Sequence, residues 1–166
     1  MVYVVMGVSG CGKTTVGTLL ANEKKIPFFD ADDFHPEENI RKMQSGNPLD
    51  DNDRKPWLNI LSEKIRDWND DSGAVLACSA LKKSYRKILT SKTNDVTFIW
   101  LDGSYDLINS RMQKREGHYM PPDLLQSQFD ALEPPSEAVK VNIDQPPDNI
   151  LSDILKTLNN FTADKR

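Results

Sequence analysis

Apolar runs and helical patterns alternate along the whole chain. Short apolar runs predict strands, and the uniformly apolar run 74–78 predicts one that is buried on both faces. Apolar positions that recur every three or four residues predict helices. By these patterns, strands are expected at 2–6, 26–29, 74–78, 96–101 and 139–143. Helices are expected at about 13–25, 36–45, 54–70, 82–92, 104–116, 123–132 and 148–161. Such alternation predicts an α/β fold with a parallel sheet and right-handed crossovers.

The stretch after the first predicted strand carries the strongest motif. Residues 7–14 read Gly-Val-Ser-Gly-Cys-Gly-Lys-Thr and match the P-loop pattern G-x-x-x-x-G-K-[ST]. The glycines let successive N–H groups point into one concavity at a helix N-terminus, where the helix dipole also favours an anion. Lys13 can reach the terminal phosphates of a nucleotide, and the Thr14 hydroxyl can ligate Mg²⁺. The predicted nucleotide-binding residues of this loop are Gly7, Ser9, Gly10, Cys11, Gly12, Lys13, Thr14 and Thr15.

Two carboxylates follow the second predicted strand. Ligands of a doubly wound sheet bind at the carboxyl ends of its strands, so this segment is expected beside the P-loop. On an extended segment, Asp30 and Asp32 point the same way and converge on one space. One would organise Mg²⁺ and its waters, and the other would accept a hydroxyl proton. The alternative is a solvated acidic turn with capping duty, and Asp102, after the fourth strand, competes for the metal.

Basic residues in two further places predict partners for an anionic acceptor. The segment 34–73 is too long for one crossover helix and is a candidate substrate-binding segment. Arg54 begins its long helix. Lys82, Lys83 and Arg86 follow the third strand, at the same edge of the sheet. An anionic acceptor beside a triphosphate needs such cations, because an unpaired carboxylate would be repelled there.

A lid is predicted for the region of about 111–133. Arg111 and Arg115 are four residues apart on one helix face and precede a Gly-His turn and two prolines. Cationic groups brought over the γ-phosphate would stabilise transfer and exclude water. The alternative is an exposed basic helix end that complements the helix dipole.

Composition and charge narrow the class of protein. A chain of 166 residues with 38% hydrophobic and 28% charged residues predicts one globular domain, residues 1–166. The net charge of −4 argues against a nucleic-acid groove. A basic N-terminal region and a long apolar run are both lacking, so we expect a cytoplasmic protein without a membrane segment. The two cysteines are expected to be buried thiols. The two histidines lack cysteine partners at the spacing of a zinc site, which disfavours structural zinc. The sequence has no N-K-x-D segment to recognise guanine, which disfavours a GTPase.

Several further blocks carry a family resemblance. They are Phe-Asp-Ala-Asp-Asp-Phe-His-Pro at 29–36, Asp-Arg-Lys-Pro-Trp-Leu at 53–58, Cys-Ser-Ala-Leu-Lys at 78–82, Arg-Glu-Gly-His-Tyr-Met at 115–120 and Leu-Gln-Ser-Gln-Phe at 125–129. With these blocks the chain resembles the gluconokinases over about 2–158. That family transfers the γ-phosphate of ATP to the 6-hydroxyl of D-gluconate. The resemblance implies a three-layer αβα sandwich related to shikimate kinase and the nucleoside monophosphate kinases, with a lid and five parallel strands in the order 2-3-1-4-5. It also implies ATP and Mg²⁺ as cofactors, D-gluconate as the substrate and a possible homodimer.

The resemblance assigns roles to individual residues. Asp30 would join Thr14 around Mg²⁺, Asp32 would hold the acceptor hydroxyl as base or orienter, and Lys13 and Arg115 would be the other catalytic groups. The remaining nucleotide contacts would be Arg111 and Arg115 on the phosphates and Gln145 and Pro146 along the adenine. The sugar-side residues would be Asp32, His35, Arg54, Lys82, His118 and Gln128. The alternatives are a kinase of another small anionic acceptor, such as shikimate, and a nucleotide-binding sensor without catalysis.

Overall fold

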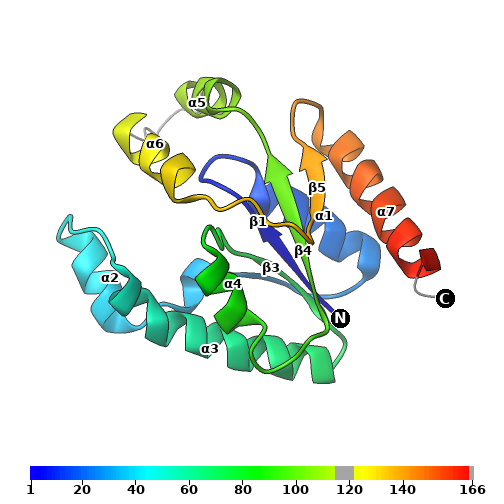
Figure 1. Cartoon of the computed structure of the whole chain (residues 1–166), viewed down its shortest axis with the longest axis horizontal. Helices are drawn as coiled ribbons and strands as arrows, with labels where there is room; N and C mark the ends of the chain where they lie inside the picture. Colours follow the sequence, from blue (N-terminus) through cyan, green and yellow to red (C-terminus); the bar gives the residue numbers. More distant parts are fainter. Residues whose placement is uncertain (115–121, 165–166) are drawn as a thin grey trace.

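A five-stranded parallel sheet lies at the centre of the molecule, with helices on both faces (Figure 1). The structure is a computed structural model that describes residues 1–114 and 122–164. The strands are β1 (Val2–Met6), β2 (Phe28–Asp30), β3 (Ala74–Ala77), β4 (Val96–Asp102) and β5 (Val139–Asn142), in the order β2-β3-β1-β4-β5. The α/β fold and the predicted strand order 2-3-1-4-5 are therefore confirmed.

The helices divide between the two faces and the rim of the sheet. They are α1 (Lys13–Lys24), the 3₁₀ helix η1 (Ala31–Phe34), α2 (Glu37–Gln44), α3 (Asp51–Asp70), α4 (Lys83–Leu89), α5 (Tyr105–Gln113), α6 (Pro122–Ala131) and α7 (Pro147–Asp164). Residues of α1 and α7 pack in one hydrophobic core, and residues of α3 and α4 pack in the other. In Figure 1, α2 and α6 lie on the left of the view, and α5 lies beyond the carboxyl end of β4. Within the described residues, no helix is long and apolar enough to cross a lipid bilayer.

The apolar run of β1 shows why the central strands were predictable. Val5 packs into the core beneath α1 and α7, while Val4 and Met6 pack into the core beneath α3 and α4. Alternate residues of a strand point to opposite faces, so a strand covered on both faces must be apolar at every position. Fully burying each such side chain stabilises the fold by roughly 1.5–3 kcal/mol.

Two boundaries near the carboxyl edge differ from the prediction. The segment after β2 does not stay extended, because Asp30 caps η1 and its Oδ1 accepts a hydrogen bond of 2.9 Å from the Asp32 N–H. The helix expected from about residue 54 begins at Asp51, behind a capping box. In that box the Asp50 side chain accepts from the Asp53 N–H at 2.8 Å, and the Asp53 side chain accepts from the Asp50 N–H at 2.9 Å.

Candidate active site

The P-loop connects β1 to α1. Gly10 and Gly12 have φ values of +80° and +97°, the left-handed region that favours glycine. A Cβ on Gly10 would also lie 2.7 Å from the Met112 side chain. Gly12 is the N-cap of α1 and supplies no side-chain cap, so the first N–H groups of the helix are left for an anion. The Lys13 ammonium donates to the carbonyls of Gly7 and Val8 at 3.0 and 3.1 Å, which leaves its third hydrogen for a phosphate.

A cavity of about 540 Å³ opens beside this loop. Its walls come from the P-loop, the end of β2, η1, α3, the loop after β3 and α6. The predicted site residues that line it are Ser9, Gly10, Gly12, Lys13, Thr14, Thr15, Asp30, Asp32, His35, Arg54 and Gln128. The structure therefore places the phosphate loop, the acidic pair and the arginine of the substrate segment around one hollow.

Asp30 and Asp32 share this hollow although the geometry expected for them was wrong. They were expected to converge because alternate residues of an extended segment point the same way, whereas the chain turns into η1 between them. Partial removal from water and the neighbouring Asp30 carboxylate raise the pKa of Asp32, while His35 and Lys13 oppose this rise. Since 83% of the Asp32 side chain is exposed, solvent limits the shift and the group stays accessible to an acceptor molecule.

His35 forms the wall next to Asp32. Only 6% of its side chain is exposed, and its ring stacks on Trp57 with centroids 4.2 Å apart. The Trp57 indole is fixed in turn by a hydrogen bond of 2.8 Å to the carbonyl of Ala31. Burial lowers the pKa of His35, and Asp32 opposes this effect while Arg54 adds to it. The imidazole is therefore neutral at neutral pH, with Nε2 3.8 Å from Asp32 Oδ1.

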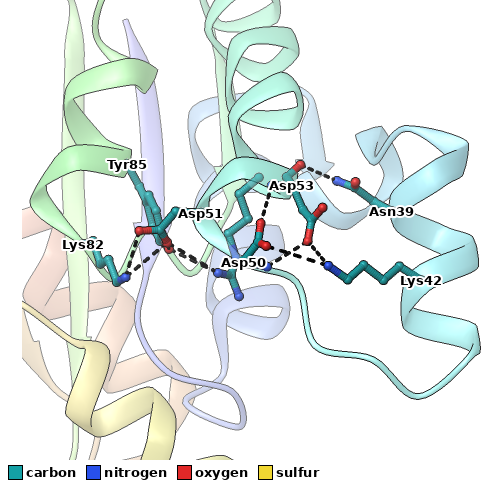
Figure 2. A network of polar contacts seen from close by, with 8 residues as sticks. Asn39, Lys42, Asp50, Asp51, Asp53, Lys82 and Tyr85 are labelled. Atoms are coloured by element: carbon teal, nitrogen blue, oxygen red, sulfur yellow. Dashed lines mark hydrogen bonds and ion pairs between the residues drawn. The ribbon is translucent and has the colours of Figure 1, made fainter.

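Arg54 reaches the cavity from α3 and is held by a polar network. Figure 2 shows three members of this network, Asp51, Lys82 and Tyr85. Arg54 Nη1 donates to the Tyr85 hydroxyl at 3.2 Å, and that hydroxyl donates to Asp51 Oδ1. Lys82 Nζ lies 3.1 Å from the same carboxylate. Hydrogen bonds from Tyr85 and Lys82 lower the pKa of Asp51, so it stays ionised and keeps the network together. Lys82, expected on the sugar, is thus paired with Asp51 and is not one of the residues that line the cavity.

Arg86 also departs from the expected anion-binding role. It is buried and donates to the carbonyls of Ala80, Leu81 and Glu133 at 2.7, 3.1 and 2.8 Å. The Glu133 side chain accepts from the Lys83 N–H at 3.0 Å. Arg86 therefore ties the chain after α6 to the loop after β3, a structural role.

A second cavity, of about 280 Å³, lies on the other side of the P-loop. It is lined by Gly10, Cys11, Gly12, Thr15, Val16, Arg111, Met112, Gln145, Pro147 and Ile150. Arg111 donates to the Ile143 carbonyl at 2.7 Å, and Gln145 Nε2 donates to the Asn142 carbonyl at 2.8 Å. The predicted adenine residue Pro146 is not in the lining, but its neighbours Gln145 and Pro147 are. Gly10, Gly12 and Thr15 line both cavities, so a nucleotide can place its base in the second and its phosphates at the first.

Gln128 joins α6 to the P-loop. Its Oε1 accepts from the Ser9 N–H at 2.7 Å, and its Nε2 donates to the Ser9 hydroxyl at 2.9 Å. Gln128 was expected on the sugar side, yet in the structure it contacts the phosphate loop while lining the larger cavity. No functional role was predicted for Trp57, Tyr85 or Asn39, of which only Trp57 lies in one of the family blocks, 53–58.

Three predicted residues fall elsewhere. Arg115 and His118 lie outside the described residues. Asp102, the competitor for the metal, pairs with Lys140 at 3.5 Å and is absent from the described linings of both cavities. Asp30 and Thr14, in contrast, both line the larger cavity, and their carboxylate and hydroxyl oxygens are hard donors of the kind Mg²⁺ prefers.

Fold and site together define a P-loop kinase of small molecules, and a family model described as shikimate kinase matches residues 9–158. The chain is 45% identical to the probable gluconokinase of Rattus norvegicus, over 95% of this chain and 97% of that protein. It is 43% identical to the gluconokinase of Gluconobacter oxydans, over 92% and 88% of the two chains. The crystal structure of a gluconokinase from Sinorhizobium meliloti superposes with a TM-score of 0.89 and 41% identity, covering 98% of this chain and 94% of the other. The protein belongs to the gluconokinase family.

Proposed function

We propose that the protein transfers the γ-phosphate of ATP to the 6-hydroxyl of D-gluconate, giving 6-phospho-D-gluconate and ADP. One observation carries the proposal: a single cavity gathers Lys13 of the phosphate loop, the Asp32 carboxylate and the Arg54 guanidinium. These are a phosphate ligand, a proton acceptor and a partner for an acidic substrate. The names of the relatives support gluconate as that acid.

Each substrate has its own place in the proposal. The adenine lies in the second cavity near Gln145 and Pro147, and the triphosphate follows the P-loop N–H groups to Lys13. Thr14 and Asp30 would hold Mg²⁺, which when bound neutralises charge on the β- and γ-phosphates. Arg111, and Arg115 beyond the described residues, are proposed as cations of the lid.

Asp32 acts on the acceptor. It accepts the proton of the 6-hydroxyl as that oxygen bonds to the γ-phosphorus, and the bond from phosphorus to the β–γ bridging oxygen breaks. Its carboxylate is exposed to the cavity, and its raised pKa makes it a stronger proton acceptor than an ordinary aspartate. Because ATP is supplied in the cytoplasm, we infer that the enzyme works there. A homodimer also remains a prediction, which sedimentation would test.

Arg54 is proposed to bind the gluconate carboxylate, with the network of Tyr85 and Asp51 holding it in place. Arg54→Met is expected to raise the KM for gluconate about 10- to 100-fold, the range for losing a charge-assisted hydrogen-bond pair, and to leave the KM for ATP unchanged. A coupled assay of ADP release measures both constants. Arg41→Met is the matched control, because Arg41 is an exposed arginine paired with Glu37 at 2.7 Å and lies outside the cavity lining.

A panel of acceptors decides between the proposal and its rivals. Gluconate, shikimate and a neutral sugar alcohol are supplied with ATP and Mg²⁺, and turnover of gluconate alone is expected. Turnover of shikimate without gluconate would make the protein a kinase of another acid. ATP binding without any acceptor-dependent turnover would make it a sensor.

A further inference from the structure

Asn39 on α2 is a buried polar residue without a part in the chemistry described so far. It is only 6% exposed. Its side-chain nitrogen Nδ2 lies 3.0 Å from the carbonyl oxygen of Asp53 and 3.3 Å from Nδ1 of His35. Figure 2 shows the bond to Asp53, which ties α2 to the first turn of α3. A buried amide with two such contacts constrains which nitrogen of the neighbouring imidazole carries its proton.

The first contact fixes which way the amide faces. A backbone carbonyl only accepts hydrogen bonds, so the atom that faces Asp53 must be the NH₂ group of Asn39. The second N–H of that group then points at His35 Nδ1, which must offer a lone pair. A neutral imidazole with an accepting Nδ1 carries its proton on Nε2. Protonation of Nδ1 would set two donors against each other, in a site where burial already disfavours the charged ring.

The contact of Asn39 with Nδ1 therefore determines that His35 presents its Nε2–H to the cavity. Stacking on Trp57 holds the ring in place, and Nε2 faces Asp32 Oδ1 at 3.8 Å. That separation is too long for a direct hydrogen bond. Since both residues line the cavity, a hydroxyl oxygen there, to one side of the line between the two atoms, can contact both at ordinary hydrogen-bond lengths. Such a hydroxyl would accept from Nε2–H and donate its own proton to Asp32.

We propose that Asn39 is a positioning residue that holds His35 in the Nε2–H form, so that His35 and Asp32 together orient the acceptor hydroxyl. His35 is the donor of this pair and Asp32 is the base. The inference rests on the proposed function only for the identity of the hydroxyl. The protonation pattern of His35 belongs to the protein itself and is measured without any substrate.

Nitrogen-15 NMR of the imidazole rings tests the pattern directly. The chain has two histidines, so the spectrum of His35→Gln assigns the His35 signals by their loss. The wild-type protein at pH 7 is expected to show a protonated Nε2 and an unprotonated Nδ1. Asn39→Asp places acceptor oxygens where the donor stood, so we expect the proton to move to Nδ1. Asn22→Asp, on the exposed surface of α1, is expected to leave the His35 signals unchanged.

Measurements of kcat give a second test, which does not depend on whether the Asn39 variant folds. Gln places its amide N–H near the position of Nε2, whereas Asn places it near Nδ1. His35→Gln is therefore expected to stay within about tenfold of the wild-type kcat, and His35→Asn to fall about tenfold further, as expected for one misplaced hydrogen bond. The KM for ATP should not change in either variant.

Three results would overturn the inference. These are a protonated Nδ1 in the wild-type protein at pH 7, an unchanged His35 spectrum in folded Asn39→Asp, and equal kcat values for His35→Gln and His35→Asn. If gluconate is not an acceptor, the proposed function fails while the wild-type NMR spectrum still decides the protonation pattern. The kcat comparison is then made with the acceptor that the panel identifies.

Discussion

Neighbouring carboxylates take different roles at the scale of single residues. Asp30 uses one oxygen to cap η1 through the Asp32 N–H, so its position is fixed by the backbone. Asp32 makes no such local bond with its side chain among the interactions described here and faces the cavity instead. The turn into η1 therefore gives the two carboxylates different surroundings. Asp30 is fixed in position, which suits a metal ligand, and Asp32 is accessible, which suits a proton acceptor.

Asp32→Asn is expected to lower kcat by about 10²-fold or more, because an amide cannot accept the hydroxyl proton. ATP binding should persist, since Asp32 does not line the second cavity. The folded state raises the pKa of Asp32, so it holds this proton more tightly than the unfolded chain does, and stability falls as pH rises from the unfolded pKa through the folded one. At pH 7 the variant should thus melt no lower than the wild type. A coupled assay and thermal melts measure the two effects.

Asp33→Asn is the matched control, because Asp33 is exposed and lies outside the cavity lining. It should keep nearly full activity. An Asp32→Asn enzyme with near wild-type kcat would remove Asp32 from the base role and return it to the solvated turn considered from the sequence.

At the scale of elements, the sequence pattern predicted the strands, but it did not predict the side-chain hydrogen bonds that set where η1 and α3 begin. The apolar runs predicted all five strands. In the central strands, burial on both faces leaves few polar positions, as Val4 and Val5 show, whereas the edge strand β5 alternates buried and exposed residues. The turn at η1 was missed because it depends on one hydrogen bond from the Asp32 N–H to the Asp30 carboxylate, within a segment whose sequence also fits an extended strand. The start of α3 was placed late because the run 50–53 holds several candidate caps, and the capping box selects Asp50.

The candidate site also contains residues that the sequence pattern predicts and residues whose contacts depend on the fold. The P-loop was predictable because its residues are contiguous and their spacing alone makes the phosphate cradle. Gln128 was assigned to the sugar, whereas it contacts Ser9, a residue 119 positions away in the chain. Lys82 was also assigned to the sugar, yet its ammonium group pairs with Asp51 of α3. Which of several cations reaches a ligand depends on tertiary pairing, and a single sequence does not contain that information.

The contact of α6 with the P-loop predicts an effect on ATP. Gln128→Glu keeps an acceptor for the Ser9 N–H but adds a negative charge beside the phosphate site. Repulsion between the added carboxylate and a bound phosphate is worth on the order of 1 kcal/mol or more. The KM for ATP is therefore expected to rise about tenfold. The KM for gluconate should change less. Initial rates with each substrate varied in turn measure both constants.

Gln126→Glu is the control on the same helix. Gln126 is exposed and donates to Asp130 at 2.9 Å, so its replacement adds the same charge away from the loop. An equal rise in the KM for ATP in both variants would mean that net charge, and not the Ser9 contact, is responsible.

At the scale of the whole molecule, the sheet edge places two cavities on either side of one loop. Their shared residues, Gly10, Gly12 and Thr15, mark where a nucleotide passes from one to the other. The acceptor side of the larger cavity, with Asp32 and Arg54, remains open to a second molecule. Direct transfer requires both substrates to be bound at the same time, and two adjoining cavities are what such binding needs.

The chain also lacks an activated thiol that would store the phosphoryl group. Both cysteines are buried, and burial raises the pKa of Cys11 and raises that of Cys78 to about 12. Neither thiolate is populated at neutral pH, and only the thiolate is a strong nucleophile. Two open substrate places without a reactive thiol favour one direct step over a phosphoenzyme.

Steady-state kinetics are accordingly expected to be sequential. Double-reciprocal plots for ATP at several fixed gluconate concentrations should intersect, since both substrates are bound before phosphorus changes partner. Labelled ADP should not exchange into ATP when the acceptor is omitted, because no phosphorylated protein forms to return the group. Parallel lines together with such exchange would require a phosphoenzyme. Asp32 would then be the first residue to examine, since a carboxylate that reached phosphorus itself could no longer be the base for the hydroxyl.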